Sequence, residues 1–215
     1  IANSDSSVTL QDGVDYTYSG GVVNFLTNLT EKVIITVNGS GNQFASYIVN
    51  LVSDLEADSN GIYTGSSGDS CTNTFAYDGT THNNLRYIGA NPCNYVNFNC
   101  DNNGENCELW HVIGVINDMV DSPLVKIVKS DLSNGGTPWN TAVSNDWLTS
   151  SLYVSLNGTY YNSLNGIYGH DLILNTKWYI DGIGSTWTSA NFYNQAYLTQ
   201  SSSPFSVGLF TPDDY

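Results

Sequence analysis

The sequence predicts an all-β protein, arranged as a β-sandwich with an extended N-terminal strand. Short segments that alternate or are rich in β-branched residues recur along the 215-residue chain, and they end at Gly, Asn, Asp or Pro. No repeat of fixed period is visible. Many short strands separated by turn residues are typical of two packed sheets, so one sandwich domain is the simplest architecture.

Each of these segments is predicted as one strand of the sandwich. The stretch 44–55 differs, since its apolar residues recur at helical spacing and Asn60-Gly61 could end a helix. Its strand-like neighbours favour a strand there, and both interpretations stay open. The predicted strands are residues 22–26, 33–37, 85–88, 95–98, 109–116, 124–128, 152–156, 172–174, 178–183, 192–198 and 205–210.

The N-terminal segment can present one apolar face as an extended strand. Its even positions include Val8, Leu10 and Val14, whereas its odd positions are mainly polar. The segment could be the first hairpin of its own domain, with Asp12-Gly13 as the turn. Alternatively, it is a donor strand that leaves its subunit and completes the sheet of a neighbour.

Domain organisation follows the second of these interpretations. Residues 1–15 are expected to form the N-terminal tail, and residues 16–215 the sandwich domain. Because the chain begins at Ile1 with no export signal ahead of it, we expect a mature, secreted form.

The balance of charges excludes two classes of partner. Five Lys and Arg residues stand against 20 Asp and Glu residues, which gives a formal net charge of −15 at pH 7. Such a surface repels phosphate, so nucleic acids and anionic membranes are excluded. Most carboxylates become protonated in acid, whereas the abundant Asn, Ser, Thr and Tyr are unaffected. We therefore expect a protein of acidic surroundings.

Four cysteines lie in the middle of the chain, at Cys71, Cys93, Cys100 and Cys107. An even number in a loop-rich stretch predicts two disulfides and an extracellular compartment. Three pairings are possible, and Cys71–Cys93 with Cys100–Cys107 is favoured because the residues between the last two resemble a turn. The chain lacks the C-x-x-C spacing of zinc sites, so no metal is expected.

Three sequons, at Asn28, Asn38 and Asn157, offer acceptors for N-linked glycans. Each is expected on a surface turn, and Asn38 and Asn157 each precede Gly at the end of a strand-like segment. In an exported chain these positions are predicted glycosylation sites.

No motif links a nucleophile to a base. The chain lacks G-x-S-x-G, H-E-x-x-H, a P-loop and the signatures of aspartic peptidases. His82, His111 and His170 are scattered, so each is interpreted as a polar surface or half-buried residue. The sequence predicts a protein that is not an enzyme and uses no cofactor.

Glu108 is the best candidate for glycosidase chemistry, which needs two carboxylates in one cleft. A strand would place Glu108, Trp110 and Val112 on one face, and Leu109, His111 and Ile113 on the other. Asp181 could be the second carboxylate, but no pattern brings it near Glu108. A solvated acid beside a rim tryptophan is the favoured interpretation.

The loop closed by the last two cysteines alternates oxygen-bearing residues at Asp101, Asn103 and Glu105, as calcium loops do. It lacks the spacing of an EF-hand, so a turn without an ion is favoured. Lys126 and Lys129 could cross-link to Asn side chains, as in some surface adhesins, but no pattern supports such bonds.

In general character the chain resembles the subunit of the archaeal thread, an extracellular filament of thermoacidophiles. The shared features are a strand-like N-terminus over residues 1–18, a β-rich body low in charge, and the sequons. They extend over the whole chain and include no diagnostic motif. The resemblance implies an immunoglobulin-like or pilin-like sandwich, heavy N-glycosylation, and a tail that fills a groove in the next subunit.

The function expected from the sequence is a structural subunit of an extracellular, pilus-like filament with a role in adhesion or biofilm. It would be a homopolymer joined head to tail, in which Val8, Leu10 and Val14 enter pockets that set the register. A secreted carbohydrate-binding module or glycosidase is the alternative, and an acid-stable peptidase is a third hypothesis.

Overall fold

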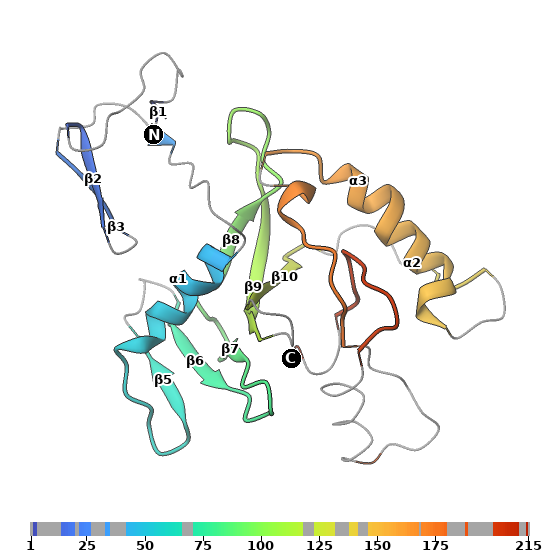
Figure 1. The fold of residues 1–215 in the computed structure, drawn as a ribbon, viewed down its shortest axis with the longest axis horizontal. Helices are drawn as coiled ribbons and strands as arrows, with labels where there is room; N and C mark the ends of the chain where they lie inside the picture. Colours follow the sequence, from blue (N-terminus) through green and yellow to red (C-terminus); the bar gives the residue numbers. More distant parts are fainter. Residues whose placement is uncertain are drawn as a thin grey trace.

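A computed structural model describes the backbone over most of the chain, and its ribbon is shown in Figure 1. The described residues are 2–3, 14–19, 22–26, 33–34, 42–65, 71–117, 123–131, 138–141, 146–167, 169–179, 188, 200–210 and 214.

An antiparallel sheet of six strands lies at the centre of the protein (Figure 1). In its middle, β9 pairs with β8 along its first half, with β7 along its second half, and with β10 on the other edge. β6 and β5 extend the sheet beyond β7. The strands are β5 (Ile62–Thr64), β6 (Thr74–Tyr77), β7 (Leu85–Tyr87), β8 (Tyr95–Phe98), β9 (Glu108–Ile116) and β10 (Leu124–Lys129).

The side chains of the central strand β9 alternate between a buried and a more exposed face of the sheet. Trp110 and Val112 are buried while Leu109 is exposed, which confirms the predicted alternation. The register with β10 then shifts, because Lys126 lies opposite Gly114 but Ile127 lies opposite Val112. This bulge moves burial to Val115, so the second half of β9 still points an apolar side chain into the core.

Helix α1 (Asn42–Ser53) covers one part of the core face. Its buried residues Ala45, Ile48 and Val52 recur every three or four positions and pack against side chains of β6, β7 and β9, among them Phe75 and Val115. The strand favoured for 44–55 is therefore wrong. A helix forms here because helical spacing places these three residues on a single apolar stripe.

A second helical region runs from η1 (Trp147–Thr149) through α2 (Ser151–Ser155), the π-helical turn η2 (Leu156–Tyr160) and α3 (Tyr161–Ser163). The predicted strand 152–156 is wrong, because Ser150 caps the helix by accepting a hydrogen bond from the backbone N–H of Tyr153. Leu164, just after α3, completes a second core with Phe98 and Trp110.

The strands predicted at 172–174 and 205–210 are wrong, and of 178–183 the structure describes residues 178–179 alone. Residues 170–172 form the 3-10 turn η3 (His170–Leu172), where a strand was expected at 172–174. Predicted strands 178–183 and 205–210 contribute isolated bridges at Tyr179 and Phe205 within the described residues, and 192–198 lies outside them. Aromatic contacts hold this segment instead, since Phe205 stacks on Trp178 with ring centroids 5.6 Å apart.

Four short strands precede the central sheet. β1 (Ala2–Asn3) pairs with β4 (Val33–Ile34), and β2 (Tyr16–Ser19) pairs with β3 (Val22–Phe25). Each pair is a separate two-stranded sheet. In Figure 1 both lie at the upper left, apart from the six strands at the centre.

The predicted class is confirmed as a mostly β protein with one six-stranded antiparallel sheet and few helices. The predicted strands 85–88, 95–98, 109–116 and 124–128 correspond to β7 through β10. Within the described part of the chain, the core face of this sheet meets helices, and no second sheet exceeds two strands.

Candidate functional site

The N-terminal strands leave apolar side chains in solvent. Val14 in the turn before β2 is 61% exposed, and Leu26 after β3 is 55% exposed. The backbone N–H of Leu26 donates to Asp15 O at 2.8 Å, which extends the hairpin by one pair. Val8 and Leu10 lie outside the described residues, so Val14 is the predicted donor-strand residue with a known position.

The two disulfides enclose strand β8. Cys71 pairs with Cys93 just before the strand, and Cys100 just after it pairs with Cys107. These are the pairs that the sequence favoured. Both ends of β8 are thus tied covalently to neighbouring segments, which restrains its backbone.

One edge of β8 faces away from the sheet. Within the described part of the chain, β8 pairs only with β9. Val112 N–H donates to Asn94 O at 2.7 Å, so the antiparallel alternation points the backbone N–H and C=O of Tyr95 and Asn97 away from β9. Both residues are exposed. The edge therefore offers hydrogen-bonding groups to a further strand.

The described sequon at Asn157 lies in η2 and not on the expected surface turn. Its Nδ2 donates to Val207 O at 2.9 Å, and its Oδ1 accepts from the backbone N–H groups of Ser206 and Val207. The amide thus fastens the C-terminal segment to the helix. Asn28 and Asn38 lie outside the described residues, and glycosylation at all three positions stays a prediction.

Glu108 contacts a cation and an indole. Its Oε1 accepts from Lys129 Nζ at 2.9 Å, and its Oε2 accepts from Trp110 Nε1 at 3.2 Å. Burial, with a smaller contribution from the charge of Glu108, raises the pKa of Tyr160 to about 12. Asp181, the expected second carboxylate of a glycosidase, lies outside the described residues.

The loop at Asp101 uses its oxygen atoms internally. Asp101 Oδ1 accepts from the backbone N–H groups of Asn103 and Glu105, both at 2.9 Å, and Oδ2 accepts from Asn106 Nδ2 at 2.7 Å. This arrangement is an Asx turn that orders the loop. Among the described side chains, no group of three or more His, Cys, Asp or Glu could hold a metal ion.

Lys126 and Arg86 bind the carboxylate of Asp214 near the C-terminus. Lys126 Nζ lies 2.5 Å and Arg86 Nη1 lies 3.4 Å from Asp214 Oδ1, and the Asp214 side chain is fully buried. Lys126 also lies over the ring of Trp178. Lys126 and Lys129 were the lysines considered for cross-links to Asn side chains. In the structure Lys126 contacts Asp214 and Lys129 contacts Glu108, so both of these partners are carboxylates.

Each histidine has polar partners. His82 Nε2 lies 3.2 Å from Tyr179 Oη, and His170 Nδ1 lies 2.8 Å from Leu164 O. His111 bridges Asn94 and Ser130, two residues that the sequence did not single out. They lie 17 and 19 positions from His111, at the ends of different strands, so no local motif could reveal them.

Comparison with known proteins finds no matching family model, no matching curated protein and no matching solved structure. In the described part of the chain, no helix has the length and apolarity needed to cross a membrane.

Proposed function

We propose that this chain is a structural subunit of an extracellular filament, joined head to tail when the N-terminal strand of one copy adds to the sheet of the next. The polymer contains copies of the same chain, carries N-linked glycans, and acts at the cell surface in adhesion or biofilm. Its sandwich is completed by the incoming strand, as the resemblance to the archaeal thread subunit implies.

The separation of β1–β4 from the central sheet carries this proposal. A two-stranded hairpin is marginally stable in water, because it buries little apolar surface. Val14 and Leu26 bury little apolar surface at the ends of the β2–β3 hairpin, since each leaves its side chain in solvent. Transfer of the segment to another subunit would supply both hydrogen bonds and burial.

Strand β8 is the acceptor that best fits this mechanism. Its outward edge carries the backbone groups of Tyr95 and Asn97, and disulfides restrain it at both ends. A restrained edge loses little conformational entropy on pairing, which favours strand addition. Successive additions of this kind are heterologous contacts, which build open filaments.

Substitution of Asn97 tests the acceptor. Asn97→Pro removes the outward N–H while leaving the N–H groups that face β9, and proline is tolerated on edge strands. We expect Asn97→Pro to abolish filaments in negative-stain microscopy and Asn97→Ala to retain them. Abundant filaments from a folded Asn97→Pro protein would reject β8 as the acceptor.

A further inference from the structure

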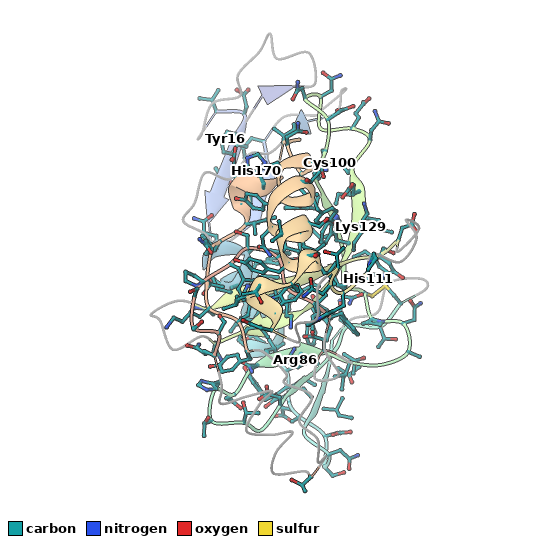
Figure 2. All side chains as sticks on the ribbon, turned by 90° about the vertical axis from the view of Figure 1, so that its right-hand side faces the viewer. Tyr16, Arg86, Cys100, His111, Lys129 and His170 are labelled. Carbon is teal, nitrogen blue, oxygen red and sulfur yellow. A yellow bond between two sulfur atoms is a disulfide. The ribbon has the colours of Figure 1, made fainter. Side chains whose placement is uncertain are left out.

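His111 lies between a hydroxyl group and an amide on the face of the sheet opposite Trp110. Its Nε2 is 3.1 Å from Ser130 Oγ, and its Nδ1 is 3.2 Å from Asn94 Oδ1. The three residues come from β9, from the position after β10 and from the position before β8. Figure 2 shows His111 between Lys129 above it and Arg86 below it.

The hydrogen bonds of Asn94 determine the tautomer of His111. Asn94 is buried, and its Nδ2 donates to Val112 O at 2.8 Å, so its Oδ1 is the atom that faces the imidazole. An amide oxygen can only accept, and therefore His111 carries its proton on Nδ1 when neutral. The lone pair of Nε2 then accepts from the hydroxyl of Ser130, which is the polarity a general base requires.

The surroundings hold this arrangement and leave the hydroxyl accessible. The ring of Tyr95 packs on the imidazole with centroids 4.4 Å apart. The backbone N–H of Ser130 donates to Leu109 O at 3.0 Å, which fixes the residue that carries the hydroxyl. Ser130 itself is exposed, so a reagent in solvent can reach Oγ.

We propose that Ser130 is a base-activated nucleophile for acyl transfer from carboxylic esters, with His111 as the base and Asn94 as a positioning residue. The hydrogen-bonded chain from nucleophile to base to orienting group matches the geometric definition of a serine triad. This proposal goes beyond the filament function and does not depend on it.

The chemistry needs an ester and water and nothing else. Ser130 Oγ bonds to the acyl carbon, its proton passes to His111 Nε2, and the ester C–O bond breaks so that the leaving alkoxide takes up that proton. Water then attacks the acyl-serine with His111 again as base, which releases a carboxylic acid and restores the Ser130 hydroxyl.

Covalent labelling with a fluorophosphonate tests the proposal on the full chain. The reagent forms an Oγ–P bond and expels fluoride, so intact-mass and peptide mass spectrometry locate the modified serine. We expect labelling at Ser130, and about a 100-fold slower rate in His111→Gln because general-base assistance is lost. Ser163→Ala is the matched control, since the exposed Ser163 Oγ donates to a backbone carbonyl and should not react.

Three results would overturn the proposal. The first is no label on Ser130 in the folded wild-type protein. The others are an unchanged rate of Ser130 labelling in folded His111→Gln and a slower rate of Ser130 labelling in Ser163→Ala. If His111→Gln does not fold, the position of the label in the wild-type protein and its loss in Ser130→Ala still decide. Circular dichroism establishes whether each variant is folded.

Discussion

At the scale of single residues, the strictest packing requirement in the sheet falls on Gly114. A Cβ atom there would lie 2.1 Å from Leu85 O, because β7 and β9 approach each other closely at this pair. Backbone atoms of two paired strands cannot move aside as a flexible side chain can. The absence of a side chain at Gly114 is therefore a condition for joining the two halves of the sheet.

We expect Gly114→Ala to lower the free energy of unfolding by about 2–3 kcal/mol through overpacking. Gly158→Ala is the control, since an added Cβ meets no atom within 4 Å in the helical turn η2. That change should be neutral or raise stability by up to about 1 kcal/mol. Urea unfolding measures both, and equal effects of the two substitutions would contradict this account of the β7–β9 contact.

Two buried phenols predict how stability depends on alkaline pH. Burial raises the pKa of Tyr87 to about 12, with a smaller effect from Tyr47, and burial likewise raises the pKa of Tyr160 to about 12. The unfolded phenols titrate near 10. Because the folded pKa is the higher one, this stabilisation is complete below about pH 10 and is lost as the pH rises toward 12.

We expect Tyr87→Phe and Tyr160→Phe to unfold at higher pH than the wild-type protein does, since each lacks a phenol that must ionise. Absorbance at 295 nm follows the tyrosinates, and circular dichroism follows the fold. Tyr95→Phe is the control, because Tyr95 is exposed. An alkaline unfolding midpoint that moves equally in all three variants would contradict the assignment.

At the scale of elements, the disulfide that closes the longer loop is expected to stabilise the segment around β8 more. Cys71 and Cys93 are 22 positions apart, and Cys100 and Cys107 are seven apart. Loop-closure entropy then gives about 3 kcal/mol for the first bridge and about 2 kcal/mol for the second.

Serine substitution of both partners in each pair tests that order. We expect the Cys71/Cys93 double variant to lose more stability in urea unfolding than the Cys100/Cys107 variant. The reverse order would show that entropy of the unfolded chain is not the main contribution.

Local sequence pattern predicted an element correctly where one hydrophobic period dominated its residues. It failed where contacts with residues distant in the sequence determine the structure. The alternation around Trp110 predicted the faces of β9, and an even cysteine count predicted both bridges. In contrast, Asp214 lies 128 positions from Arg86, and Ser130, His111 and Asn94 meet only after β8, β9 and β10 are paired. No local periodicity carries such contacts, so the sequence revealed neither the C-terminal ion pairs nor the Ser130 site.

At the scale of the whole molecule, the net charge of −15 predicts higher stability in acid than at neutral pH, since protonation relieves repulsion among carboxylates. Asp58 opposes this trend, because hydrogen bonds from the backbone N–H of Ile62 and then of Asn60 lower its pKa. Its stabilisation is present above the ordinary pKa and is lost as the pH falls through the lowered value.

We expect relief of the repulsion among the excess negative charges to change stability more than protonation of the exposed Asp58 does. The melting temperature should therefore be highest below about pH 5. Calorimetry across the pH range measures this directly. A maximum well above pH 5 would contradict the expected acidic surroundings.

The proposed assembly makes the same demand on every subunit: an apolar strand must leave its own chain and enter the next. Leu10→Asp places a charge on the face expected to be buried there, whereas Thr9→Asp places one on the opposite, polar face. Negative-stain microscopy of the two purified proteins is the most direct test. The account predicts filaments for Thr9→Asp and none for Leu10→Asp; filaments of Leu10→Asp at wild-type abundance would contradict it.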